Sequence, residues 1–204
     1  MNVVFVTGGL AAGKQTACRY LQQTKGASYL DADGIAKDLL EDELVIERLV
    51  QLYGSTIRNA KGDILRGRLA ELAFVSPEAS QGLNMTIWPR VKEVLADILI
   101  APSVTQEGGG SFVLVEIAML AEAPDFCDLA DYILVIRADE PVRIQRALDR
   151  GMNLVDIKNR LALQASDAQR AALANLVITN NGSKQALYQQ LDTWYDSFFH
   201  GRLF

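Results

Sequence analysis

The chain has 204 residues, half of them hydrophobic, which suffices for one α/β domain with an inserted lobe but is a tight fit for two full domains. Its net charge of −5 argues against general nucleic-acid binding, which relies on a broad basic surface. The single histidine, His200, and two cysteines without metal-type spacing offer little for a His-based triad or a multi-histidine metal site, so we expect the chemistry to come from Lys, Arg and carboxylates.

The N-terminal segment joins a short apolar run to a glycine-rich turn. Val3 to Val6 predict a strand buried on both faces, and Ala17 to Gln23 predict a helix. The ten residues from 7 to 16 read T-G-G-L-A-A-G-K-Q-T. A helix N-terminus behind such a turn directs several N–H groups and a partial positive charge at one point, where Lys14 adds a full charge. The segment is therefore predicted to bind a polyphosphate.

One position of this motif departs from the usual pattern, G-x-x-x-x-G-K-S/T, whose last hydroxyl binds the Mg²⁺ of a nucleotide. Here Gly8, Gly13 and Lys14 are followed by Gln15, and Thr16 comes one place late. The phosphate loop is predicted, whereas the metal site at Gln15 stays open.

Two carboxylates follow the second predicted strand, Ala27 to Leu30. In open parallel sheets ligands bind at the carboxyl ends of the strands, so Asp31 and Asp33 are expected to face the phosphate loop. The alternative is structural, with a strand-end turn and Asp33 as the N-cap of a helix beginning at Ile35.

About 80 residues separate the second strand from the third, too many for a simple crossover. We predict an inserted helical lobe here, with Pro89 kinking or breaking its last helix. Its helix-like segments are Ile35 to Leu40, Leu44 to Tyr53, Leu65 to Phe74 and Ala79 to Ile100.

An alternation of strands and helices returns after Gly108 to Gly110, and it predicts a parallel sheet of about five strands flanked by helices. The strands are Phe112 to Ile117, Tyr132 to Ile136 and Leu176 to Thr179; the helices are Pro141 to Arg150, Val155 to Gln164 and one from Ser183 onward.

The helix from Pro141 to Arg150 carries arginines on one face, Arg143, Arg146 and Arg150, and Arg170 follows later. A solvated charged face would explain them. In a nucleotide enzyme, arginines on a mobile segment commonly surround the migrating phosphoryl group.

In their order along the chain, these segments resemble the dephospho-coenzyme A kinases, which phosphorylate the ribose 3′-hydroxyl in the last step of coenzyme A synthesis. The resemblance spans nearly the whole chain. Its motifs are Thr7-Gly8-Gly9 with Gly13-Lys14, Leu30 to Asp33, Arg66 with Leu69 and Phe74, Met119 to Glu122, Arg146 with Arg150, Arg160 to Gln164, and Ile178 to Gly182. Departures occur at Ala11, Gln15, Trp88, Ala118 and Asn175.

The resemblance implies an α/β P-loop fold: a nucleotide-binding core of residues 1–33 and 111–204, a lid at about 140–170, and a substrate-binding lobe at 34–110. It implies that Lys14 neutralises charge between the β- and γ-phosphates, that Asp33 orients or deprotonates the 3′-hydroxyl, and that Arg146 meets ATP from the lid. Asn181 and Gly182 would flank the adenine. The acceptor side would involve Asp31, Asp33, Arg66 and Glu122. The ATP phosphates would be held by Gly8, Gly9, Leu10, Ala11, Ala12, Gly13, Lys14, Gln15 and Thr16, with Gln15 nearest the Mg²⁺.

Two other functions remain open from the sequence: another small-molecule or nucleoside monophosphate kinase, and a nucleotide-binding protein that has lost catalysis. No apolar run approaches the roughly 18 residues of a membrane span, and no basic leader opens the chain. We therefore expect a cytoplasmic enzyme that uses ATP, Mg²⁺ and dephospho-coenzyme A and binds neither nucleic acid nor membranes, with an undetermined oligomeric state.

Overall fold

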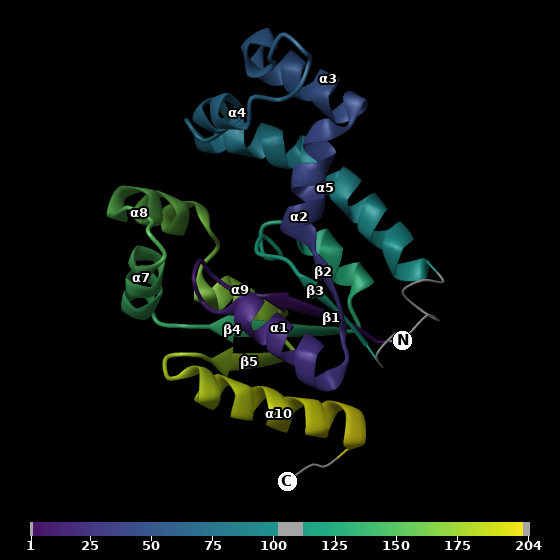
Figure 1. The fold of residues 1–204 in the computed structure, drawn as a ribbon, viewed down its shortest axis with the longest axis vertical. Coiled ribbons are helices and arrows are strands. Elements are labelled where there is room, and N and C mark those ends of the chain that lie inside the picture. The colour runs from purple at the N-terminus through teal and green to yellow at the C-terminus, as the bar shows by residue number, and fades with distance from the viewer. Residues whose placement is uncertain (1, 102–111, 202–204) are drawn as a thin grey trace. The chain divides into compact units, whose positions relative to one another are not determined.

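A five-stranded parallel sheet organises one of the two units into which the chain divides (Figure 1). The computed structural model describes residues 2–101 and 112–201. Residues 1–31 and 102–204 make up the core unit, and residues 32–101 make up the helical unit. The glycines at 108–110 and the predicted boundary at 110/111 lie outside the described residues.

All strand pairings in the sheet are parallel, in the order β2-β3-β1-β4-β5, which confirms the predicted fold class. Val4, Phe5 and Val6 of the central strand are fully buried, because helices cover both faces of the sheet. The strands are β1 (Asn2–Thr7), β2 (Ser28–Asp31), β3 (Phe112–Glu116), β4 (Tyr132–Arg137) and β5 (Leu176–Thr179).

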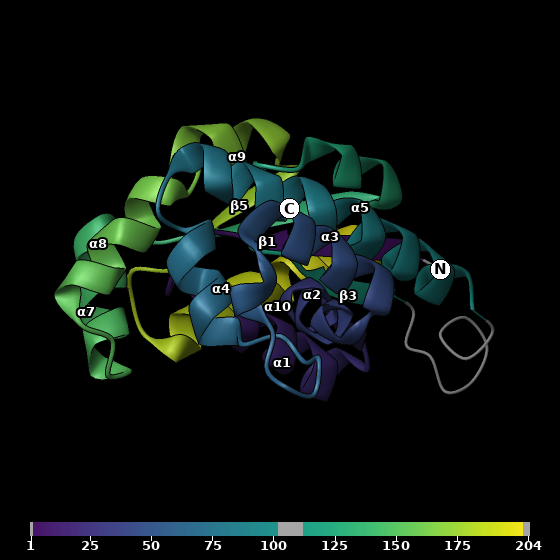
Figure 2. The same cartoon turned by 90° about the horizontal axis from the view of Figure 1, so that it is seen from above.

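The helices of the core unit lie on both faces of this sheet. Val4 and Val6 share a cluster with Leu21 and Leu191, which belong to two helices on one face. Figure 2 shows α9 on the other side of the sheet from α1. These elements are α1 (Lys14–Lys25), η3 (Pro124–Leu129), α7 (Glu140–Asp149), α8 (Leu154–Leu163), α9 (Asp167–Leu173) and α10 (Lys184–His200).

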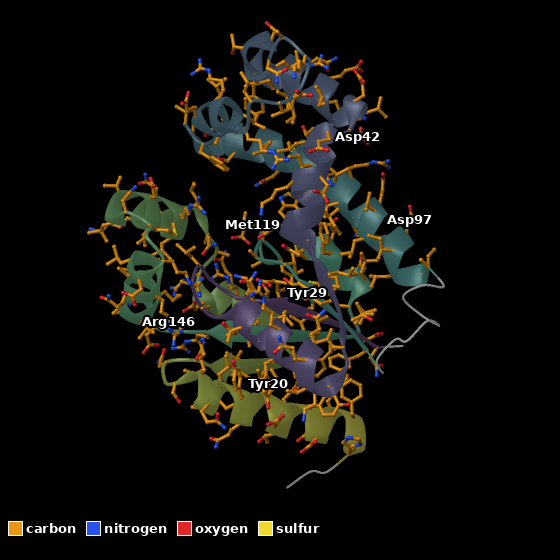
Figure 3. The ribbon with its side chains drawn as sticks, viewed as in Figure 1. Tyr20, Tyr29, Asp42, Asp97, Met119 and Arg146 are labelled. Atoms are coloured by element: carbon orange, nitrogen blue, oxygen red, sulfur yellow. The ribbon has the colours of Figure 1, made fainter. Side chains whose placement is uncertain are left out.

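An aromatic contact joins the two helices of the first face. Tyr20 of α1 stacks on Tyr188 of α10 with ring centroids 4.0 Å apart, and its hydroxyl donates to Asp192 (2.8 Å; Figure 3). This contact holds the helix behind the phosphate loop against the C-terminal helix.

The helical unit is built around its longest helix, α5, which contacts α2, α3 and α4. Asp42 caps α3 by accepting from the N–H groups of Leu44 and Val45, and Ser76 caps α5 by accepting from that of Ala79. The elements are α2 (Ala32–Asp38), η1 (Leu39–Glu41), α3 (Glu43–Tyr53), η2 (Ser55–Ile57), α4 (Arg66–Ala73) and α5 (Pro77–Ile100).

Two of the local alternatives that the sequence left open are wrong. Helix α2 begins at Ala32, so Asp33 belongs to its first turn and is not the N-cap of a helix starting at Ile35. Helix α5 continues through Pro89, although a break was one expected outcome. A proline removes one backbone donor, and the full burial of Val91 and Leu95 beyond it maintains the helix.

Candidate functional site

The loop of residues 8–13 connects β1 directly to α1 and has the backbone that phosphate binding requires. Gly8 has a φ of 153° and Gly13 a φ of 110°. A Cβ atom at Gly8 would overlap the carbonyl oxygen of Ile136 on β4. Gly13 is the N-cap of α1 and offers no side-chain acceptor to its first-turn N–H groups, which can therefore serve an anion.

Lys14 and Ala11 contribute a positive charge and a packing contact to the phosphate loop. The ammonium of Lys14 donates to the carbonyl oxygens of Gly8 (3.0 Å) and Gly9 (3.3 Å), so its charge lies over the loop. Ala11 has a φ of 55°, a left-handed backbone conformation that glycine adopts more readily. Its side chain is buried with Ala147 and Ile157, so the loop packs on α7 and α8. The N–H of Leu10 also donates to Gln164, directly after α8 (2.9 Å).

Asn180, a buried residue far along the sequence from the phosphate loop, holds the loop by a hydrogen bond. The side-chain amide of Asn180 donates to the carbonyl oxygen of Ala12 (2.7 Å), and a Cβ atom at Gly13 would overlap that amide. The neighbouring Asn181 and Gly182 were predicted as site residues from the sequence, whereas Asn180 was not. The available signal was the asparagine of the I-x-N-x-G pattern, which is residue 180.

The loop after β5 is attached to the start of α7. Asn181 accepts from the N–H of Asp139 and donates to its carboxylate, both at 2.8 Å. Arg146 donates to the carbonyl oxygens of Asn180 (2.9 Å) and Gly182 (3.3 Å; Figure 3). Burial and the neighbouring Arg150 lower the pKa of the Arg146 guanidinium. The structure thus brings together Arg146, Asn181 and Gly182, which were predicted separately.

Carboxylates also lie at the carboxyl end of the sheet. In the register, Asp31 of β2 is beside Glu116 of β3, which is beside Val6 of β1. Glu116 accepts from the hydroxyl of Tyr29 (2.7 Å), and burial followed by this hydrogen bond raises the Tyr29 pKa (Figure 3). Glu116 was not predicted from the sequence as a site residue, because it lies inside the strand expected over Phe112 to Ile117; in the structure it ends β3 as Asp31 ends β2.

Charges near this edge affect the pKa of a buried thiol, that of Cys18. Burial, chiefly, and then Glu116 raise the pKa of Cys18 on α1, whereas Lys14 lowers it. The cation of Lys14 and the carboxylate of Glu116 therefore act on the Cys18 pKa in opposite directions.

The remaining predicted residues lie in different settings. Gln15 is exposed in the first turn of α1, followed by Thr16. Glu122, after β3, accepts from the N–H of Ala165 (2.6 Å). In the helical unit, Asp33 lies in the first turn of α2, and Arg66 pairs with Glu41 (3.5 Å) while its side chain is 54% exposed.

The arginines of α7 do not form one solvated face. Arg143 is 8% exposed and turns toward Gly9, whereas Arg146 binds the loop after β5. For Arg143 the solvated alternative is therefore wrong, because the side chain packs against the phosphate loop.

Within residues 2–101 and 112–201, no helix is both long enough and apolar enough to cross a membrane. The same ranges contain no group of three or more His, Cys, Asp or Glu side chains placed to hold a metal ion.

Comparison with known proteins shows which family has this arrangement. The family model for dephospho-CoA kinase matches residues 2–186. The dephospho-CoA kinase of Chlorobium chlorochromatii (strain CaD3) is 34% identical over 200 residues, covering 95% of this chain and 92% of that protein.

Solved structures agree in fold. The structure of TT1252 from Thermus thermophilus superposes with a TM-score of 0.75 at 25% identity, covering 96% of this chain and 97% of that one. The dephospho-CoA kinase from Campylobacter jejuni superposes with a TM-score of 0.68 at 23% identity, covering 99% of each chain. Given the family match over residues 2–186 and the phosphate loop described above, the chain belongs to the dephospho-CoA kinase family.

Proposed function

We propose that this protein transfers the γ-phosphoryl group of ATP to the ribose 3′-hydroxyl of dephospho-coenzyme A, which yields coenzyme A. The observation that carries this proposal is the phosphate loop, with Lys14 over it and Asn180 holding Ala12, in a chain of the dephospho-CoA kinase family. Such a loop binds the phosphates of a nucleotide through backbone N–H groups and one lysine.

The residues divide into three roles in this proposal. The loop from Gly8 to Gly13 and the first turn of α1 bind the β-phosphate, and Lys14 offsets charge between the β- and γ-groups. Arg146 and the 180–182 loop bind the nucleotide beside them. Asp33 accepts a hydrogen bond from the 3′-hydroxyl and orients it, as the family resemblance implies.

A direct assay tests the function against its alternatives. Purified protein is incubated with ATP, Mg²⁺ and either dephospho-coenzyme A or a set of nucleoside monophosphates, and phosphorylated products are measured. We expect turnover with dephospho-coenzyme A alone. Turnover only with another acceptor would assign a different kinase activity, and ATP binding in a calorimeter without any turnover would identify a protein that has lost catalysis.

The Mg²⁺ that accompanies ATP poses a question particular to this chain. When bound, the ion neutralises phosphate charge. Gln15 places a neutral amide oxygen at an exposed position in the first turn of α1, so its donor chemistry fits an oxygen-binding ion, but its side chain is longer than that of serine. Because Mg²⁺ tolerates little departure from octahedral geometry, we propose that the nucleotide supplies most of the binding.

Gln15→Ser is therefore expected to raise turnover at low Mg²⁺ and to lower the Mg²⁺ concentration needed for half-maximal rate, because serine offers a compact oxygen on a short stem. Rates are measured across a Mg²⁺ titration of both proteins. Thr16→Val is the companion variant. If this variant loses turnover at low Mg²⁺, the ion is bound by Thr16. Superimposable curves for the native protein and Gln15→Ser would show that residue 15 does not contact the metal.

Arg146→Ala is expected to lower both ATP affinity and maximal rate by about 10-fold or more, the size expected for losing charge-assisted hydrogen bonds. Without the guanidinium, the carbonyl oxygens of Asn180 and Gly182 lose their hydrogen bonds. Asn180, whose side chain holds Ala12 of the phosphate loop, would then be less well fixed. Calorimetry with ATP and initial rates measure the two effects. Arg146→Lys retains the charge and should recover part of them. Unchanged values for both variants would place Arg146 outside the nucleotide site.

A further inference from the structure

Two arginines to which the family resemblance gave no role, Arg143 and Arg170, are buried close to one carboxylate, that of Asp167. Arg143 of α7 is 8% exposed and Arg170 of α9 is 1% exposed. Arginine is rarely buried this deeply unless its charge is paired. Both belong to the core unit, as does the phosphate loop.

The ion pairs of the two buried arginines converge on one carboxylate, that of Asp167. Asp167 lies 3.2 Å from Arg170, 3.9 Å from Arg143 and 3.9 Å from Arg137, so three guanidinium groups share its carboxylate. Arg137 also pairs with Asp139 (3.7 Å). Burial lowers the pKa of Arg170, and the charges of Glu122 and Asp167 only partly oppose this. In these ion pairs neither buried guanidinium therefore has a carboxylate that it does not share.

The hydrogen bonds of this arginine cluster are also incomplete. Among residues 2–101 and 112–201, the buried Nε of Arg143 and the buried Nε and Nη2 of Arg170 have no hydrogen-bond acceptor. A buried charged N–H group that lacks an acceptor costs more folding free energy than one that has an acceptor. An anion that supplied the missing acceptors would remove this cost, so these N–H groups are suited to bind one. Asp167 is 34% exposed and gives the cluster a side open to solvent.

The cluster touches the phosphate loop. A Cβ atom at Gly9 would overlap Nη1 of Arg143 and would lie 3.2 Å from its Cζ, so the guanidinium packs directly on the backbone of the loop. Lys14 donates to the carbonyl oxygen of the same residue (3.3 Å). Two cations from different elements thus meet at Gly9.

We propose that Arg143 and Arg170 form an anion site on the Gly9 side of the phosphate loop, and that this site binds the phosphoryl group as it leaves ATP. The fork of a guanidinium matches two oxygens of a phosphoryl group, and the arrival of these oxygens displaces the carboxylate of Asp167.

The role in catalysis rests on the proposed function. During transfer, the bond between the γ-phosphorus and the β,γ-bridging oxygen breaks and a bond from the 3′-oxygen to the γ-phosphorus forms. The hydroxyl proton passes to Asp33, and ADP carries away the bonding electron pair. The two arginines donate hydrogen bonds to the non-bridging oxygens throughout.

The anion site can be tested without the acceptor substrate. The protein is saturated with ADP, which fills the phosphate loop, and inorganic phosphate is then titrated while the thermal unfolding midpoint is followed. The native protein is expected to show a further rise. Arg143→Met and Arg170→Met should lose this second rise. Their response to ADP alone is measured in parallel, so that loss of the anion site can be separated from damage to the phosphate loop. Arg19→Met on the exposed face of α1 is the matched control.

Two more variants separate anion binding from a merely structural role. Asp167→Asn removes the competing carboxylate, so it is expected to strengthen phosphate binding to the ADP complex, whereas a structural ion pair predicts no gain. Arg143→Lys and Arg170→Lys keep the charge and should recover part of the phosphate response. No second rise in the native protein, or an undiminished rise in both methionine variants, would overturn the proposal.

A rate measurement tests the catalytic step separately. With dephospho-coenzyme A and ATP, the methionine variants are expected to lower kcat by about 10² or more with little change in the KM for ATP, since contacts made mainly in the transition state affect kcat. An equal loss of ADP binding would instead assign the arginines to holding the loop. If the native protein shows no kinase activity but the phosphate response follows the arginines, the proposed function fails and the anion site stands.

Discussion

Gly8→Ala is expected to destabilise the protein by about 3 kcal/mol and to abolish measurable ATP binding, because steric overlap and backbone strain each contribute roughly 1–3 kcal/mol. The new methyl group would overlap the carbonyl oxygen of Ile136, a backbone atom of β4 that cannot rotate away. The φ of 153° at this position also disfavours any side chain. Either the strand or the loop must then shift, and the N–H groups no longer converge. Denaturant unfolding and calorimetry with ATP measure the two effects.

Gly26→Ala is the matched control, because Gly26 also has a positive φ (68°) but nothing lies within 4 Å of an added Cβ atom. It should show only the strain, about 1 kcal/mol, and normal ATP binding. If Gly8→Ala were no more destabilised than Gly26→Ala and bound ATP normally, the close approach of the loop to β4 would not be what shapes the site.

Asp33→Asn is expected to lower turnover by a factor of about 10² or more while leaving ATP affinity within about twofold. Asparagine keeps the shape of the side chain but cannot accept the hydroxyl proton. In a loose phosphoryl-transfer transition state the proton leaves late, so part of the loss reflects orientation of the 3′-hydroxyl. Rates with saturating ATP and dephospho-coenzyme A, and calorimetry with ATP, measure both quantities.

Asp31→Asn is the comparison for this experiment, because Asp31 lies two residues earlier, at the end of β2. A folded Asp33→Asn protein with near-normal turnover would remove Asp33 from the reaction. A large loss in Asp31→Asn alone would then transfer the role to Asp31.

The sequence by itself was enough to predict the parallel sheet and the position of the phosphate loop. Strands buried on both faces are continuous apolar runs, and a phosphate loop is a local pattern of glycines and lysine between a strand and a helix. Each signal lies within about ten residues, so it can be interpreted without knowing the rest of the fold. The family resemblance rested on the same kind of local motif.

Only the tertiary structure decided which neighbours of these motifs act on the loop. Asn180 binds Ala12 across 168 positions of sequence, whereas its neighbour Asn181 bonds to Asp139. The I-x-N-x-G pattern marks residue 180, but it does not show which distant residue Asn180 contacts. Helical spacing placed Arg143 and Arg146 on one face, but packing buries Arg143 against Gly9 and leaves Arg146 to bind carbonyl oxygens beyond β5. Burial and charge pairing are properties of surfaces that meet after folding. For that reason the sequence offered Arg143 and Arg170 as candidate phosphoryl-binding cations but not their burial beside Asp167 or the contact of Arg143 with Gly9.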